Sequence, residues 1–157
     1  KLLNGYPCGI DEVDDALKIL GFFLDLKAID KFKTGLESLS PHGEQKHVMA
    51  ARLLGNKGFL KEAYEHALLV PDSPDNLPLK AKIAQNLERF ADAAAHYAVL
   101  ESMRTLAVKE YVNYVNCLIK ADEVDIARTA GATALRTYPD NPIIGRLAGI
   151  LRITQPT

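Results

Sequence analysis

Tryptophan is absent from the sequence, aromatic residues make up only 7% of it, and there are two cysteines. Cys8 and Cys117 lie far apart in unrelated contexts, so they indicate neither a disulfide framework nor a CxxC metal or redox motif. No stretch approaches the run of about 18 apolar residues that a membrane helix requires, so we expect no membrane span.

Neither sign of charge predominates, because 19 Lys and Arg residues are balanced by 20 Asp and Glu residues and the formal net charge is −1. A general nucleic-acid binder needs an excess of Lys and Arg on one face to neutralise phosphates. The charge balance therefore predicts no nucleic-acid partner, and it disfavours RNA binding by a helical repeat.

Catalytic motifs are also missing: the sequence has no GxSxG, no P-loop and no GxGxxG. Cys117 lies in an apolar helical pattern without an evident activating base. His66 and His96 recur at equivalent places, but no third ligand accompanies them, and His42 and His47 lack an HExxH-type partner. We therefore expect a protein that is not an enzyme and that holds no cofactor or metal.

What the chain does contain is apolar residues at helical spacing, and no alternating strand pattern competes with them. Of its 157 residues 48% are apolar and 25% are charged, which is typical of a soluble helical protein. The clearest segment runs from Val108 to Pro142 and reads as two helices. Asp122 is predicted to cap the second helix, and the stretch from Pro139 to Pro142 to end it. The sequence predicts an all-α fold.

Similar two-helix units fill the chain, which we expect to form one domain over residues 1–157. An irregular lead-in over residues 1–10 precedes repeats at about 11–43, 44–76, 77–107 and 108–142. In the first repeat Gly21 is predicted to break the first helix, and the second helix to run from about Leu24 to Leu39. A terminal helix is predicted over about 143–152, directly after Pro142, which is suited to the first helical position. This helix is either a cap or a self-association surface.

The second helices align through an alanine anchor, and the units recur with a period near 34 residues. The four anchors are Ala28, Ala63, Ala93 and Ala127. Ala51, Ala81 and Val115 occupy a small-residue site of the first helix. Leu60, Phe90 and Val124 form a bulky opening of the second, where the first unit has Asp25. This pattern resembles the tetratricopeptide-repeat family, which implies an α-α superhelix of about four hairpins plus the terminal helix. Other helical-hairpin solenoids and an unrelated helical bundle remain alternatives.

In the family it resembles, the first helices line a concave surface that holds partner segments. Transferred to this chain, the resemblance implies a polar and basic set at Gln45, Arg52, Asn56, Lys82, Gln85, Asn86, Lys109, Asn116 and Lys120. Asn side chains can pair with a peptide backbone, and Lys and Arg can hold carboxylates. The apolar residues Val48, Pro78 and Val112 lie one turn earlier, where a carboxylate clamp would need Lys or Asn. An acidic or amphipathic segment of a protein is therefore the expected partner.

We therefore expect a non-catalytic protein–protein interaction module that serves as an adaptor, a scaffold or a chaperone-like protein. The alternative is an accessory region that positions substrate for a larger enzyme or for a secretion or assembly machine. The sequence begins at Lys1 instead of Met and shows no secretory pattern, so we expect a trimmed chain. No compartment is indicated, and the cytoplasm is only the default expectation.

Overall fold

The computed structural model describes residues 10–38 and 43–153, and in these ranges the chain is all-α, with nine helices and no strand. The helices are α1 (Ile10–Asp25), α2 (Ile29–Glu37), α3 (Gly43–Asn56), α4 (Leu60–Leu68), α5 (Leu77–Asn86), α6 (Phe90–Met103), α7 (Val108–Lys120), α8 (Val124–Thr137) and α9 (Pro142–Ile150). The predicted all-α class is confirmed for this part of the chain. Cys8, Leu39, His42 and nearly all of the predicted lead-in lie outside it.

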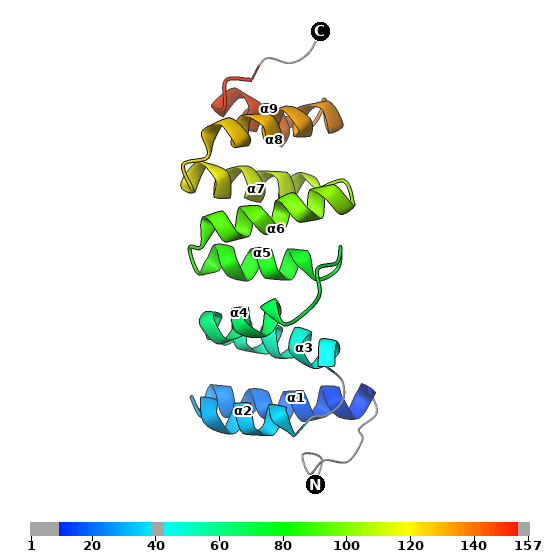
Figure 1. Ribbon diagram of the computed structural model, residues 1–157, viewed down its shortest axis with the longest axis vertical. Coiled ribbons are helices and arrows are strands. Elements are labelled where there is room, and N and C mark those ends of the chain that lie inside the picture. Colours follow the sequence, from blue (N-terminus) through cyan, green and yellow to red (C-terminus); the bar gives the residue numbers. More distant parts are fainter. Residues whose placement is uncertain (1–9, 39–42, 154–157) are drawn as a thin grey trace. The chain divides into compact units, whose positions relative to one another are not determined.

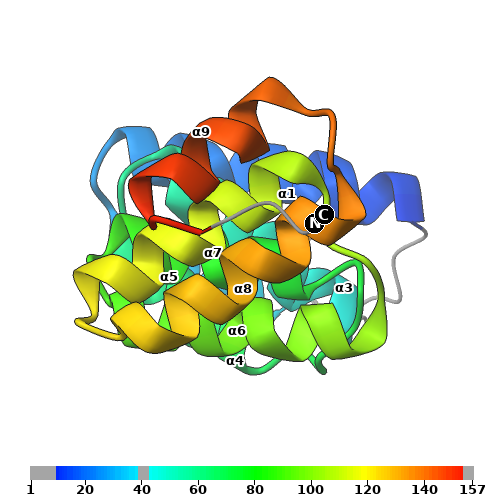
Figure 2. The ribbon, with the colours of Figure 1, turned by 90° about the horizontal axis from the view of Figure 1, so that it is seen from above.

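The chain forms two compact units, Lys1–Asp72 and Ser73–Thr157. In the first unit α1 packs against α2 and α3, and α3 packs against α4 (Figure 1). In the second unit each helix packs against the next, and α9 contacts α7 as well as α8 (Figures 1 and 2). The helices of both units are therefore paired as hairpins, and the expectation of one domain over 1–157 stays a prediction.

One backbone turn joins the two helices of every hairpin. Its central residue has a positive φ, of 56° at Lys27, 87° at Gly58, 60° at Glu88 and 62° at Asp122. The next residue donates its N–H to a carbonyl five residues back, as Phe59 does to Leu54 at 2.8 Å. This pair of features is the Schellman motif, which satisfies the last carbonyls of a helix. The four turns are 30 to 34 residues apart, so they define the repeat register without reference to side chains.

That register corrects the sequence prediction for the first hairpin. Gly21 does not break α1, which continues to Asp25; a Cβ at Gly21 would lie 3.6 Å from Leu53 Cδ2, so the glycine is a packing position. Ala28 is the half-buried N-cap of α2, and Phe32, four residues later, is the true equivalent of the other anchors. Ile29 is then the bulky opening residue, in place of Asp25.

The turn preceding α8 also differs from the prediction. Asp122 does not cap this helix but holds the left-handed turn conformation, which Asp tolerates better than most residues. Glu123 is the N-cap residue, and its side chain makes no capping hydrogen bond. The helix start is therefore fixed by the Schellman turn and by packing.

Small residues lie where the helices of each later hairpin cross. Ala63, Ala93 and Ala127 are completely buried, as are Ala51 and Ala81 on the facing first helices. Without larger side chains at these points, the helix backbones approach closely and the flanking apolar residues fill the remaining space. The prediction that the anchors at 63, 93 and 127 are buried is confirmed.

Polar contacts join the hairpins of the second unit. The Arg104 guanidinium donates two hydrogen bonds to the Glu110 carboxylate, at 2.8 and 2.9 Å, and Glu110 also accepts from the Ala107 N–H at 2.8 Å. The Tyr138 hydroxyl at the end of α8 donates to the Leu106 carbonyl at 2.8 Å. The α6–α7 connection is therefore held from both sides.

The last helix begins as predicted. Asn141 accepts hydrogen bonds from the Ile143 and Ile144 N–H groups, at 2.9 and 3.2 Å, and Pro142 is the first helical residue. Arg152, just after α9, again has a positive φ, of 55°. The helix therefore ends as the first helix of each hairpin does. Within the described ranges, no helix is long and apolar enough to cross a membrane.

Candidate functional site

Eight of the nine predicted partner-binding residues are exposed on first helices, and Gln85 is half-buried. Relative to the turn, Arg52, Lys82 and Asn116 occupy one equivalent position, six residues before the residue with positive φ. A second equivalent position, two residues before it, holds Asn56 in α3, Asn86 in α5 and Lys120 in α7, so polar residues recur at both places.

Lys120 has a contact of its own. Its ammonium lies 4.8 Å from the centroid of the Phe90 ring, at the start of α6. This is cation–π geometry, which is worth about 0.5 to 1 kcal/mol at an exposed site. The contact orients the lysine and leaves its remaining N–H groups to a ligand or to water.

The three apolar residues that the sequence places one turn before the polar positions are only partly exposed. Val48, Pro78 and Val112 are each half-buried. They therefore offer the edges of apolar side chains instead of a deep groove, which suits contact with an extended segment better than the insertion of a large side chain.

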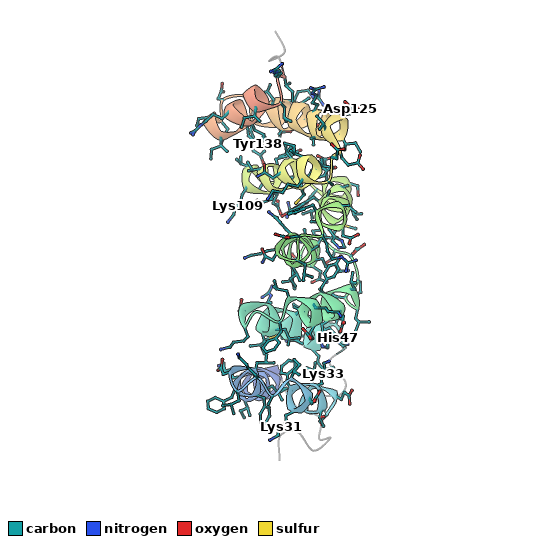
Figure 3. All side chains as sticks on the ribbon, turned by 90° about the vertical axis from the view of Figure 1, so that its left-hand side faces the viewer. Lys31, Lys33, His47, Lys109, Asp125 and Tyr138 are labelled. Atoms are coloured by element: carbon teal, nitrogen blue, oxygen red, sulfur yellow. The ribbon has the colours of Figure 1, made fainter. Side chains whose placement is uncertain are left out.

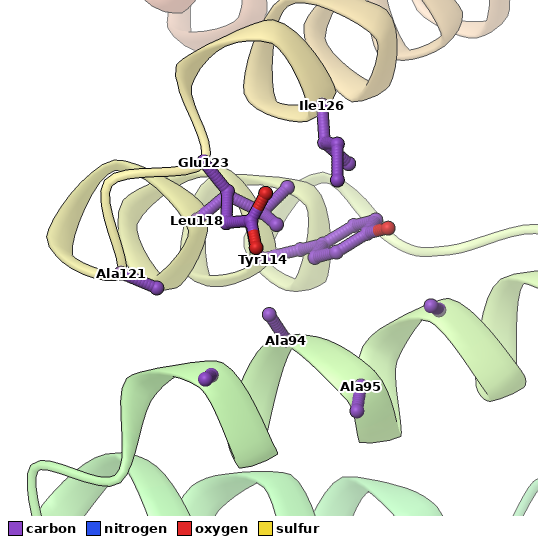
Figure 4. Close-up of a pocket in the computed structure, with 9 residues that line it drawn as sticks. Ala94, Ala95, Tyr114, Leu118, Ala121, Glu123 and Ile126 are labelled. Carbon is purple, nitrogen blue, oxygen red and sulfur yellow. The ribbon is translucent and has the colours of Figure 1, made fainter.

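A separate apolar hollow of about 200 Å³ lies in the second unit, between α6, α7 and the start of α8. Figure 4 shows Ala94 and Ala95 of α6 facing Tyr114 and Leu118 of α7 across it. The carboxylate of Glu123, in the α7–α8 turn, lies at its edge (Figure 4). The residues predicted for partner binding do not line this hollow.

Cys117 is not a reactive thiol. The side chain is 1% exposed, and burial raises the pKa of the thiol, so it stays protonated near neutral pH. Among the described residues, no group of three or more His, Cys, Asp or Glu side chains is arranged to hold a metal ion.

One feature escaped the sequence prediction. His47 of α3 and His66 of α4 have their Nδ1 atoms 3.0 Å apart, in a pocket that Lys33 of α2 also lines. Figure 3 shows Lys33 and His47 close together on one side of the first unit. The repeat alignment could have indicated that His47 lies at a buried position, since the corresponding residues Leu77 of α5 and Tyr111 of α7 are buried.

These two surfaces, the polar first-helix set and the histidine pocket, are the candidate sites. The comparisons with protein-family models, with curated proteins and with solved structures gave no match to this chain.

Proposed function

We propose that this chain is a tetratricopeptide-like solenoid that binds a segment of another protein along its first helices and catalyses no reaction. The observation that supports this most is the recurrence of exposed polar residues at fixed distances from an identical turn. Arg52, Lys82 and Asn116 make up one row of equivalent positions, and Asn56, Asn86 and Lys120 make up the other. In the first hairpin the same two positions hold the buried Gly21 and the exposed Asp25, so the recurrence belongs to α3, α5 and α7.

The chemistry of the rows suits an acidic, extended segment. The amide of Asn116 or Asn86 offers both a donor and an acceptor, which match the N–H and C=O of a peptide unit. The ammonium of Lys82 and the guanidinium of Arg52 can hold Asp and Glu carboxylates through charge-assisted hydrogen bonds. The half-buried Val48, Pro78 and Val112 then contact apolar side chains of the same segment.

Within each unit the side chains project from helices whose ends are fixed by the same turn, so little backbone inside a unit has to be ordered when the partner arrives. Long Lys and Arg side chains still lose rotamer freedom, which limits the affinity that each contact adds. We therefore expect specificity to come from the spacing of several modest contacts.

A charge-reversal experiment tests the proposal. Peptides are selected against the wild-type protein from a random library, and their affinity is measured by fluorescence anisotropy. The double variant Lys82→Glu/Lys109→Glu should bind the selected acidic peptides more weakly by at least about tenfold, since a charge-assisted hydrogen bond contributes about 1.5 to 3 kcal/mol.

The matched control reverses two exposed arginines of a second helix. Arg128→Glu/Arg136→Glu changes the net charge by the same amount, on α8, and should leave the affinity near the wild-type value. Equal losses in the two variants would mean that only overall charge matters. Selection of no peptide, or of peptides that the first variant binds as well as the wild type does, would contradict the proposed site.

A further inference from the structure

The rings of His47 and His66 meet edge to edge. Their centroids are 5.2 Å apart, the ring planes are 27° apart, and the Nδ1 atoms are separated by 3.0 Å. The centroid separation is close to the Nδ1–Nδ1 distance plus one ring radius on each side. The two nitrogens therefore point at one another, as in an in-line N–H···N hydrogen bond.

This geometry fixes the number of protons that the pair can hold. One Nδ1 must carry a hydrogen and the other must present its lone pair. A further proton can be added at the Nε2 of the donor ring, giving a single imidazolium whose hydrogen bond to the neutral ring is charge-assisted. A second imidazolium would place two N–H groups head to head. The intact pair therefore carries a charge of zero or plus one.

The pair opens onto a pocket with a net positive lining. The pocket has a volume of about 250 Å³ and is lined by Lys33, Leu36 and Glu37 of α2, Lys46 and His47 of α3, and His66 of α4. Two ammonium groups therefore face one carboxylate, and Glu65 on α4 adds a second, more distant negative charge at His66. The volume is several times the roughly 30 Å³ that a water molecule occupies in the liquid.

Packing alone does not explain a histidine at position 47. The corresponding places hold Leu77 in α5 and Tyr111 in α7, both of which are buried, whereas the place of His66 holds His96 in α6 and Ala130 in α8. Partly burying two imidazoles beside two lysines carries a desolvation cost that an aliphatic side chain would avoid. A ligand that compensates the positive charge would recover that cost.

We propose that this pocket binds a small oxyanion, a carboxylate or a tetrahedral anion such as sulfate, and that binding is coupled to the uptake of one proton by the His47–His66 pair. The anion lies between Lys33 and Lys46 and accepts a hydrogen bond from the imidazolium. The site is separate from the first-helix rows proposed above and does not depend on them.

The electrostatics of the pocket agree with this coupling. Burial lowers the pKa of His47, and the positive charge of Lys46 lowers it further. Burial also lowers the pKa of His66, with His47, Lys33 and Lys46 acting in the same direction and Glu65 opposing them. An anion among these groups reverses the Coulomb contribution of the lysines, so it favours the protonated pair.

The test follows the ¹H and ¹⁵N resonances of the two imidazoles during titration with sodium sulfate and, separately, with sodium acetate, at constant ionic strength. Sulfate keeps its charge between about pH 5.5 and about pH 7.5 and acetate keeps most of its own, so a tenfold pH dependence belongs to the protein. We expect saturable shifts at both rings, with a dissociation constant at least about tenfold higher at the upper pH because a proton is taken up on binding. Tighter binding of acetate than of sulfate would identify a carboxylate as the ligand, and the reverse a tetrahedral anion.

Three variants separate a binding site from a structural feature. Lys46→Gln should weaken binding by about tenfold or more, whereas Glu37→Gln should strengthen it, because it removes the one carboxylate among the described residues of the lining. Lys31→Gln is the control, since Lys31 is on the same helix as Lys33 but does not line the pocket.

The gain expected for Glu37→Gln cannot arise from misfolding. Shifts that do not saturate, affinity that does not change with pH, or a Glu37→Gln variant that binds no more tightly than the wild type would each overturn the proposal.

Discussion

The α3–α4 and α7–α8 hairpins have the same type of backbone turn but carry different side chains around it. Counting from Gly58 in the first and Asp122 in the second, His47 corresponds to Tyr111 and His66 to Ala130. The α7–α8 hairpin has a buried aromatic residue and a buried small residue at these places, and the α3–α4 hairpin has two polar rings joined by a hydrogen bond. The turn and the crossing point therefore determine the hairpin geometry, while neighbouring positions can hold polar or functional side chains.

The crossing point itself shows the same freedom. Phe32 of the first hairpin and Ala93 of the third occupy the same place and are both completely buried. On the facing helices, Leu20 corresponds to Ala81, and both are completely buried too. The hairpins therefore differ in how much side-chain volume separates their helices, and exchanging that volume should be costly in either direction.

The largest effect is expected from Phe32→Ala. Removing a fully buried ring leaves a cavity and should lower the free energy of unfolding by about 3 to 5 kcal/mol. Native-state hydrogen exchange of α1–α4 amides measures this locally. Phe22→Ala, in α1, is the control, because Phe22 is 65% exposed and its loss should cost little. Equal costs for the two variants would contradict the assigned register.

The converse change is Ala93→Leu. The added side chain has no space at the α5–α6 crossing, and overpacking should destabilise the second unit by about 1 to 3 kcal/mol, as measured by urea unfolding. Ala95→Leu, on the exposed side of α6, should stay within about 0.5 kcal/mol of the wild type. A tolerated Ala93→Leu would show that the crossing is looser than described.

A smaller effect is expected from exchanging residues between turns. Gly58→Glu should destabilise by about 1 kcal/mol, because a side chain disfavours the left-handed conformation. Nothing lies within 4 Å of a Cβ at Gly58, so steric clash does not contribute. Glu88→Gly should stabilise by about 0.5 to 1 kcal/mol, the relief of strain exceeding the flexibility that glycine adds. The melting temperatures of both variants measure these effects. Shifts of the same sign in the two variants would contradict the conclusion that the two turns have the same backbone conformation.

The smallest effect concerns pH. Because the folded pKa values of His47 and His66 are lowered, the unfolded chain binds more protons once the pH falls below the ordinary histidine value of about 6.5. Stability is therefore retained above that pH and declines from there toward the lower folded pKa. In a buffer without oxyanions, His47→Leu/His66→Ala, which introduces the residue of α5 at position 47 and the residue of α8 at position 66, should show a flatter profile than the wild type in urea unfolding at several pH values. A parallel profile would contradict the assignment.

The later hairpins could be predicted from sequence because small residues mark their crossings. Ala63, Ala93 and Ala127 lie in register with the turns, so the helix pairs were identified correctly. In the first hairpin Phe32 takes the place of alanine, and the nearby Ala28 and Gly21 imitate an anchor and a break. The side-chain volume that fits at a crossing depends on both helices together, so the apolar pattern of one helix does not predict it.

The polar pair could not be predicted for a different reason. His47 and His66 are 19 residues apart, and their contact depends on the orientation of two rings across α3 and α4. Sequence spacing places both residues on inward faces but gives no ring direction. The helix junctions near Glu88 and Asp122 were predicted, but their left-handed conformation was not, because neither has the glycine that is usual at such a position.

Mapping a bound peptide by amide chemical shifts tests the central claim, that the repeated first-helix positions form the binding surface. With a selected acidic peptide, we expect the largest amide chemical-shift changes in α5 and α7, around Lys82, Asn86 and Asn116. Perturbations centred on Ala95 and Ile126, beside the apolar hollow of α6 and α8, would contradict it.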